Sequence, residues 1–354
     1  MLYKRLVRTI ALALFILCST QNLFSSEKKA LFPYPIDIVY LWVDGGDPNW
    51  LSIKNSYSKI YQEETVFTGD ACIDSRFSDH EELRYSLRSL LKFAPFFRHI
   101  YIITMNQRPK WFIDHPKITI VDHQEVFKDL EDLPTFNSQA IESNLHRIRG
   151  LAEHFIYFND DVLLGKSVSP YDFFTKNGKI NVLFEKGFTV SPSPEVQATL
   201  YRKAWVNSNL LLDTYFIREP RYRLCHAPFA LRKSLIQDVE CRFPCVFECN
   251  SCHKFRTDQD FNITNGLLQY IWLYQGYVKK GRLTNKMISC YSNERFVETK
   301  EALNSFLASP LHTFCIQDCT TEDRIEVSQC LKNFFETLLP EAAPWEKQEL
   351  SVNE

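Results

Sequence analysis

The sequence lacks a large net charge, a long hydrophobic run and any internal repeat. Its 354 residues carry 41 Lys and Arg against 43 Asp and Glu, which gives a formal net charge of −2. A chain so close to neutrality has no general attraction to nucleic acid or to an anionic membrane surface, so we expect no nucleic-acid partner. Hydrophobic residues make up 45% and charged residues 24%, which is ordinary for a globular protein. Most of the chain is therefore expected to fold.

Residues 1–30 have the layout of a targeting segment. Lys4, Arg5 and Arg8 precede an apolar run from Ile10 to Leu17, and polar residues follow. This order is typical of a signal peptide or of a signal anchor. The run is shorter than the about 20 residues that a membrane-spanning helix needs, so cleavage and retention are equal alternatives. The segment predicts a membrane-associated or secretory-pathway protein, in a Golgi-type lumen or at a bacterial inner membrane.

Cysteine is frequent, with 11 in the chain, and ten remain when Cys18 of the leader is set aside. An even count in an exported chain permits disulfides. Cys241, Cys245, Cys249 and Cys252 form a dense group. Free thiols are the least favoured interpretation of this group. Four soft ligands at such short spacings could hold a structural Zn²⁺ ion, and disulfides are the slightly favoured alternative. Under both interpretations the group stabilises the fold and has no catalytic role.

Strand-like and helical patterns alternate along residues 31–335. Short runs rich in β-branched and aromatic residues predict strands, and apolar residues at spacings of three and four predict helices. The predicted strands are 36–43, 99–104, 118–122 and 155–158, and the predicted helices are 78–93, 138–151 and 262–277. This alternation indicates an α/β domain with a mostly parallel sheet flanked by helices. The Cys-rich segment would be an insertion, and residues 336–354 are expected to form a frayed tail.

Two adjacent carboxylates, Asp160 and Asp161, directly follow the apolar run Phe155–Phe158 and Asn159. Oxygen ligands of this kind hold Mg²⁺ or Mn²⁺, and a cation there can neutralise a diphosphate. The alternative is a turn or a helix cap, where Asp is common. Placement at the end of a predicted buried strand gives the two interpretations about equal weight.

Further candidates lie at helical spacing. Glu142 and His146 are four residues apart on a predicted helix and would share one face, with Arg147 beside them. Arg84 and Arg88 are spaced in the same way on an earlier helix. These arginines could hold phosphates or pair with the two glutamates at the start of their helix. For each set the alternative is a solvated helix face.

Two more candidates lie between predicted elements. His226 stands in the segment Leu224–Pro228, and a loop histidine titrating near neutral pH is a candidate general base. Arg256 precedes the aromatic-rich helix and could reach into a cleft, where its planar fork suits a phosphate group. Viewed singly, such residues are more often structural.

Together, four separated regions of the chain resemble the Stealth family. That family includes bacterial capsular polysaccharide phosphotransferases and the catalytic subunit of the animal lysosomal-enzyme N-acetylglucosamine-1-phosphotransferase. The resembling segments are Ile36–Gly45; then Glu82–Ser89, Leu133–Ser138, Ala140–Ile148 and Phe155–Asp161; then His226–Pro228 with Phe255–Arg256; and Phe314–Asp318. They place the regions at 36–50, 76–180, 222–277 and 312–320. Met105–Gln107 and Gln317 depart from the residues usual in the family.

The resemblance implies a glycosyltransferase-A-like, Rossmann-related fold and a Mg²⁺ or Mn²⁺ ion. It also implies transfer of a sugar-1-phosphate, such as N-acetylglucosamine-1-phosphate, from a nucleotide-sugar donor to a hydroxyl of a glycan acceptor. A UDP-sugar is the expected donor, and nucleoside monophosphate is the expected leaving group.

By similarity, each candidate residue receives a role. Asp161, with help from Asp160, would bind the metal ion, and His226 would accept the proton of the attacking hydroxyl. Arg256 would hold phosphate oxygens and Glu142 would position the substrate. The expected substrate-binding residues are Trp42, Asp44, Arg84 and Arg147.

Two other functions remain as alternatives. One is a metal-dependent glycosyltransferase that releases nucleoside diphosphate. The other is an inactive glycan-binding module, which the presence of Glu142, Asp161, His226 and Arg256 disfavours.

Overall fold

The computed structural model describes residues 32–64, 77, 79–190, 199–319 and 324–347. The chain divides into two units, Met1–Pro33 and Tyr34–Glu354, and the fold belongs to the second. The predicted targeting segment 1–30 lies outside the described residues. Among the helices that the structure describes, none is both long and apolar enough to cross a membrane.

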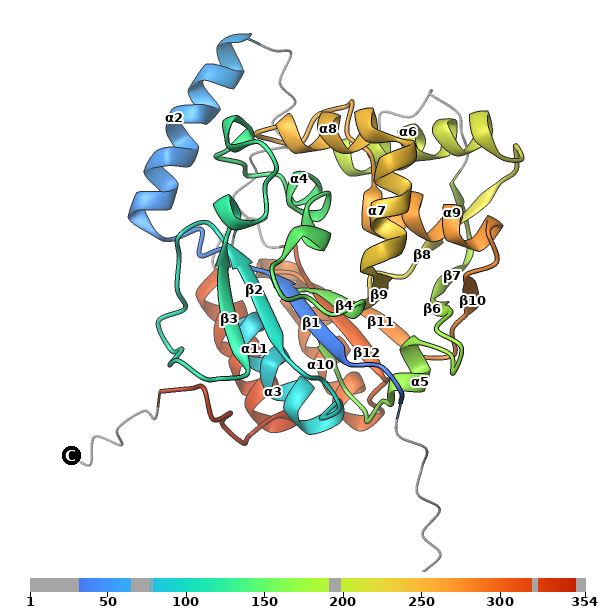
Figure 1. Cartoon of the computed structure of the whole chain (residues 1–354). Helices are drawn as coiled ribbons and strands as arrows, with labels where there is room; N and C mark the ends of the chain where they lie inside the picture. The colour runs from blue at the N-terminus through green and yellow to red at the C-terminus, as the bar shows by residue number, and fades with distance from the viewer. Residues whose placement is uncertain (1–31, 65–76, 78, 191–198, 320–323, 348–354) are drawn as a thin grey trace, which may run out of the picture. The chain divides into compact units, whose positions relative to one another are not determined.

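A five-stranded, mostly parallel sheet organises the domain (Figure 1). Its strands, in spatial order, are β3 (Ile118–Asp122), β2 (Ile100–Thr104), β1 (Ile36–Leu41), β4 (His154–Asn159) and β9 (Phe229–Arg232). The first four are parallel to one another, and β9 runs antiparallel to β4. The α/β class and the four predicted strands are confirmed. Because β1 to β4 run in one direction, the residues that follow them emerge at one edge of the sheet.

The central strands are buried along their length, as expected for a parallel sheet covered on both faces. One charged residue lies among them. Asp37 on β1 is fully buried, and its carboxylate accepts two hydrogen bonds from the Arg98 guanidinium and one from the backbone N–H of Ala152. These bonds offset the desolvation of the carboxylate.

A second sheet and three helices form a large apolar core. The sheet has the order β11 (Asn285–Cys290), β12 (Thr313–Asp318), β5 (Val162–Leu164). Helix α3 (Glu82–Phe93) packs on β5, and α10 (Phe296–Ala308) packs on β11 and on α11 (Arg324–Leu338). The core between them includes Tyr85, Phe306, Phe314, Phe334 and Phe335. It fixes β12 beside β5, which directly follows the Asp160–Asp161 pair.

The remaining elements lie above the main sheet and to its right in the view of Figure 1. The strands are β6 (Ile180–Val182) paired with β10 (Val278–Lys280), and β7 (Phe184–Val190) paired with β8 (Arg221–Leu224). The helices are α2 (Pro48–Glu64), α4 (Ser138–Glu142), α5 (Pro170–Phe173), α6 (Leu200–Tyr215), α7 (Lys233–Arg242), α8 (Pro244–Cys252) and α9 (Leu268–Tyr274). A π-helical turn, Ile263–Leu267, leads into α9, so the predicted helix 262–277 is present with an irregular first turn.

The predicted helix 138–151 is wrong in its length. Helix α4 ends at Glu142, and a separate 3₁₀ turn covers Leu145–Arg147. Between them, Ser143 Oγ donates to the carbonyl of Gln139, and Asn144 Nδ2 donates to the carbonyl of Ala140. Side chains that bond nearby backbone compete with helix continuation. Glu142 and His146 consequently do not share a helix face.

The prediction of a frayed tail from residue 336 is also wrong. Helix α11 continues to Leu338, and the chain then packs back on the domain as far as Lys347, with Ala343 and Trp345 buried. Glu346 is buried between the guanidinium groups of Arg84 and Arg88. Sequence pattern missed this because the segment after Pro340 is charged and its partners lie far away along the chain.

The Cys-rich segment forms α7 and α8, and the structure supports neither predicted role for it. None of the nine described cysteines is in a disulfide. Cys241, Cys245 and Cys252 are exposed, and the four sulfurs of the segment do not gather as a ligand group. A helix rises about 5.4 Å per turn, so cysteines three or four residues apart are spread along a stripe and do not converge on one ion.

Candidate active site

A cavity of about 530 Å³ opens where the parallel strands end. Trp42 follows β1, Met105 follows β2, His123 follows β3, and the run Asn159–Asp161 ends β4 and begins the next turn; all line the cavity. The crevice beyond the carboxyl ends of parallel strands is the usual ligand site of open α/β sheets. The sheet topology thus places the predicted Asp pair in this cavity.

Other elements complete the walls. Strand β12 contributes Cys315 and Asp318, the loop between β8 and β9 contributes His226, and the segment before the π-helical turn contributes Arg256. These residues lie far from the Asp pair in sequence; for example, Cys315 and Asp161 are 154 residues apart. The structure therefore brings together the predicted metal, base and phosphate-binding residues.

Backbone hydrogen bonds, one within its own turn and one from β12, hold the Asp pair in place. The backbone N–H of Asp161 donates to Asp160 Oδ1 at 3.1 Å, and the N–H of Ile316 donates to the carbonyl of Asp161 at 2.9 Å. Burial, followed by the charge of Asp161, raises the pKa of Asp160 well above its ordinary value. Asp161 Oδ1 accepts no hydrogen bond among the described residues, and its nearest charged partner is His226 Nε2 at 3.4 Å. Adjacent carboxylates that repel each other fit a divalent cation with hard oxygen ligands.

Three acidic side chains near this pair were not predicted as site residues. Glu82 and Asp318 line the same cavity, and Asp79, which is exposed at the surface, lies near Glu82. Burial raises the pKa of Glu82 to about 8, and the nearby carboxylates of Asp79 and Asp160 add to that shift. His80 lies between Glu82 and Asp318, with Nε2 3.4 Å from Asp318 Oδ2. The helical pattern explained Glu82 as a first-turn residue, so sequence gave no signal for its place in the cavity.

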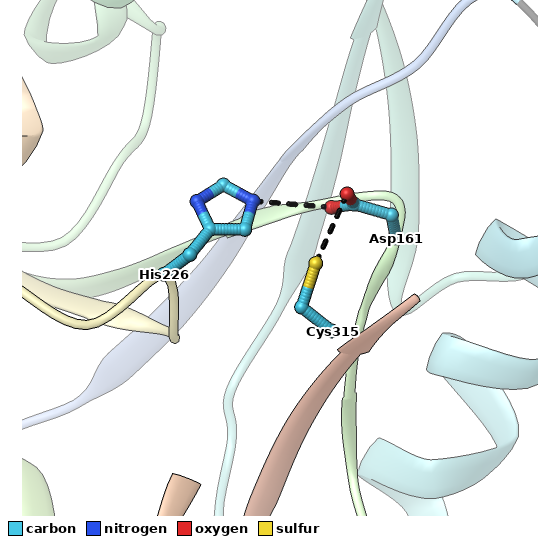
Figure 2. A group of neighbouring side chains, drawn as sticks. All are labelled: Asp161, His226 and Cys315. Atoms are coloured by element: carbon cyan, nitrogen blue, oxygen red, sulfur yellow. Dashed lines mark hydrogen bonds and ion pairs between the residues drawn. The ribbon is translucent and has the colours of Figure 1, made fainter. Parts of the chain in front are cut away.

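His226 faces the Asp pair. Its Nε2 lies 3.4 Å from Asp161 Oδ1, and Figure 2 shows the ring pointing toward that carboxylate. Burial acts to lower the pKa of His226, but the carboxylates of Asp161 and Glu142 outweigh it, and the pKa is raised above 6.5. The imidazole is therefore placed to exchange a proton inside the cavity.

Glu142 lies behind the cavity wall instead of lining it. Its carboxylate accepts a hydrogen bond from Tyr157 Oη at 3.2 Å and another, short one from Thr264 Oγ1. Burial raises the pKa of Glu142, and the nearby charges of Arg256 and His226 oppose that shift. Arg256 lines the cavity, and its Nη2 donates to Ser138 Oγ at 2.9 Å. Glu142 thus acts on the cavity through its charged neighbours.

Three predicted substrate-binding residues lie elsewhere. Arg84 donates from Nε to Glu346 Oε2 at 2.6 Å and from Nη1 to Glu81 at 3.0 Å. Arg147 pairs with Glu240, which also contacts His146. Neither arginine lines the cavity, because each is engaged by a carboxylate distant in sequence.

Asp44 also has a structural role. Its side chain accepts a hydrogen bond from the N–H of Gly46 at 2.9 Å, and its backbone exchanges two hydrogen bonds with the Gln107 amide. It does not line the cavity, whereas Trp42 does. Trp42 Nε1 donates to Asp79 Oδ2 at 3.2 Å, which fixes the indole.

Another part of the cavity wall is aromatic. Trp50, Phe77 and Phe136 line it, with Met105 beside them, and they belong to one apolar cluster. The ring centroids of Trp50 and Phe136 lie 5.4 Å apart in an edge-to-face arrangement. The cavity wall therefore has a charged part and an aromatic part.

The chain matches the four conserved regions of one known protein family. Conserved regions 1, 2, 3 and 4 of Stealth proteins match residues 34–62, 76–182, 225–273 and 304–354, in order. The capsular polysaccharide phosphotransferase LcbA of Aeromonas hydrophila is 34% identical over 319 residues, covering 87% of this chain and 86% of LcbA. The chain belongs to the Stealth family. The predicted resemblance is confirmed, and the fourth region extends well beyond 312–320.

Other Stealth relatives are longer. An exopolysaccharide phosphotransferase of Streptomyces coelicolor is 36% identical over 320 residues, which are 89% of this chain but 53% of the relative. Two more from that organism give 57% and 54% coverage of the relative, so the chain spans about half the length of these proteins.

Among solved structures, the galactosyltransferase LgtC matches with a TM-score of 0.38 and 11% sequence identity. The match covers 87% of this chain and 98% of that chain. We derive no functional role from this match.

Proposed function

We propose that this Stealth-family chain transfers a sugar-1-phosphate unit from a nucleotide-sugar to a hydroxyl group of a glycan acceptor, in polysaccharide or glycoconjugate synthesis. Relatives named capsular and exopolysaccharide phosphotransferases support this assignment. The observation that carries it is the convergence of Asp160, Asp161, His226 and Arg256 on one cavity at the carboxyl edge of the sheet. The proposed donor is a UDP-sugar such as UDP-N-acetylglucosamine.

Asp161 and Asp160 would hold the Mg²⁺ or Mn²⁺ ion of this reaction. When bound, such an ion neutralises charge on the donor diphosphate. The carboxylates of Asp161 and Asp160 supply hard oxygen ligands for it.

Arg256 and His226 carry the remaining chemistry. Arg256, tethered by Ser138, would donate to phosphoryl oxygens as charge builds on them. As the acceptor oxygen bonds to the phosphorus next to the sugar, the bond from that phosphorus to the departing nucleoside monophosphate breaks. His226 Nε2 takes the acceptor proton. Such transfers depend mainly on positioning and charge stabilisation, so the base is secondary.

Glu142 is a positioning residue in this scheme. Its negative charge lies behind Arg256 and His226 and orients both, while Tyr157 and Thr264 fix the carboxylate. The aromatic part of the cavity wall offers flat apolar surface for a nucleobase. A cavity of about 530 Å³ is in the range of small-molecule sites.

Membrane association through residues 1–30 is part of the proposal. It rests on the three basic residues and the apolar run near the amino terminus. Fractionation of cells that express the full chain tests it, and recovery only in the soluble fraction would contradict it.

Incubation of the full chain with a panel of nucleotide-sugars, an acceptor glycan and Mg²⁺ or Mn²⁺ tests the reaction. We expect nucleoside monophosphate as the product, and loss of turnover in Asp161→Asn with folding intact. Asp114→Asn is the matched control, because Asp114 is an exposed carboxylate on the surface. Release of nucleoside diphosphate would establish a glycosyltransferase instead, and the absence of turnover with every donor would favour a glycan-binding module.

A further inference from the structure

The proposed reaction gives no role to several polar side chains of the cavity, and one of these is a thiol. Cys315 on β12 is buried, with 1% of its surface exposed, yet it lines the cavity. Its thiol donates a hydrogen bond to Asp161 Oδ2, with Sγ 3.2 Å from the oxygen. Figure 2 shows Cys315 and His226 pointing at the same carboxylate from different elements.

The three ligand atoms are close enough to surround one ion. Cys315 Sγ, His226 Nε2 and an Asp161 carboxylate oxygen all lie within 4.8 Å of one another. In a tetrahedral zinc site with bonds of 2.0 to 2.3 Å, neighbouring ligand atoms stand about 3.3 to 3.8 Å apart. Cys315 Sγ lies 3.2 Å from Asp161 Oδ2 and His226 Nε2 lies 3.4 Å from Asp161 Oδ1, so each of them is already near that spacing from one oxygen of the carboxylate.

The chemistry of the three ligands selects a class of cation. Mg²⁺ binds oxygen ligands, whereas a thiolate and an imidazole suit Zn²⁺ and related ions. Three protein ligands with the fourth position facing a cavity is the pattern of an accessible zinc site and not of a closed structural one. On binding, the cation takes the place of the thiol proton, which passes to solvent.

We propose that Asp161, His226 and Cys315 form a site for a borderline divalent cation of the zinc class, and that its occupancy stops sugar-phosphate transfer. Inhibition follows because the cation would engage both Asp161 and His226. This second statement rests on the proposed function, whereas the binding statement does not.

Cobalt(II) titration of the purified chain tests the binding statement. Replacement of Cys241, Cys245, Cys249 and Cys252 by Ser first removes the exposed and partly exposed thiols of the Cys-rich segment, which could bind cobalt themselves. In that background we expect one equivalent of Co²⁺ to give a sulfur-to-cobalt charge-transfer band. The band should vanish in Cys315→Ser and persist in the matched control Cys290→Ala, whose thiol is also buried but lies in the apolar core. A band that survives Cys315→Ser, or no band at all, overturns the site.

His226→Asn provides a second test in case Cys315→Ser does not fold, which circular dichroism would show. It keeps the thiol and removes the nitrogen ligand, and we expect the Co²⁺ affinity to fall about tenfold or more. An unchanged affinity in a folded His226→Asn protein would contradict the site.

Zinc titration of the transfer reaction, at saturating Mg²⁺, tests inhibition. We expect half-inhibition of Cys315→Ser to need about tenfold more Zn²⁺ than half-inhibition of the parent protein. Equal sensitivity of the two proteins would refute inhibition through this site. If no donor supports turnover, the proposed function fails, and the cobalt titration still decides the metal site on its own.

Discussion

Glu346 holds the carboxyl-terminal segment to helix α3, and its charge is the basis of a quantitative prediction. The carboxylate accepts hydrogen bonds from Arg84 Nε, from Arg88 Nε and Nη2, and from the backbone N–H of Ala343, at 2.6 to 2.9 Å. The side chain of Glu346 has no exposed surface, and the two arginine side chains are 7% and 5% exposed. Glu346→Gln would leave two buried positive charges facing a neutral amide.

Breaking a buried ion pair on one side costs about 3 to 5 kcal/mol. We expect the lower end, because the Gln carbonyl oxygen can still accept one of these bonds. For a domain of about 300 residues, an unfolding entropy of about 2.1 cal/mol/K per residue converts about 3 kcal/mol into a fall in Tm of about 5 °C.

Thermal unfolding followed by circular dichroism measures this change. Glu341→Gln is the matched control, because Glu341 is an exposed carboxylate of the same segment. Glu346→Gln with the same Tm as Glu341→Gln would refute the reasoning and would mean that the segment does not stabilise the domain.

The effect should depend on pH. Burial raises the pKa of Glu346, but Arg88, Arg84 and the Ala343 N–H outweigh it, so the folded-state pKa lies below 4.5. A depressed carboxyl pKa contributes stability above the unfolded-state value and loses it as pH falls through the folded-state value. The Tm difference between the parent and Glu346→Gln should therefore be full at pH 7 and shrink below about pH 4.5.

Three further predictions concern the cavity. With transfer as the assay, activity should rise with pH through the raised pKa of His226, which lies above 6.5. His226→Ala should lower kcat/KM about 10² to 10⁴-fold. An unchanged pH profile in that variant would exclude His226 as the base. Glu142→Gln should shift the acidic limb of the pH profile to lower pH, because a negative charge that raises the His226 pKa is removed; a profile that does not move would show that Glu142 does not act on His226. Thr264→Val should lower the free energy of unfolding by about 1 to 3 kcal/mol, since the buried Glu142 carboxylate loses a hydroxyl partner. Chemical denaturation measures this loss, and it should show none for the control Thr214→Val, because Thr214 is exposed.

The sequence alone predicted the four parallel strands of the main sheet and missed the antiparallel strand β9. The strands Ile36–Leu41, Ile100–Thr104, Ile118–Asp122 and His154–Asn159 were visible as short apolar runs. Burial on both faces of a parallel sheet demands such runs, so the signal is local and needs no knowledge of partners. The family resemblance, confirmed by the four matched regions, gave roles to His226 and Arg256, which the residues alone had offered as candidates.

The errors arose where a side chain's role depends on what lies opposite it. Arg84 was expected to bind substrate, but its partner Glu346 is 262 residues away. Arg147 was assigned in the same way, and its partner Glu240 is 93 residues away. Periodicity places a charged residue on a face of its own element, but it cannot say which carboxylate the tertiary structure brings to that face.

The sequence by itself determined that Asp160 and Asp161 end a buried strand, because a run of apolar residues followed by polar ones is readable within a few positions. Only the tertiary structure decided what surrounds them. It placed Glu82, His226 and Cys315 from three other parts of the chain around the same cavity. The physical reason is that burial patterns are local properties of a strand, whereas charge and ligand environments are set by contacts between elements remote in sequence.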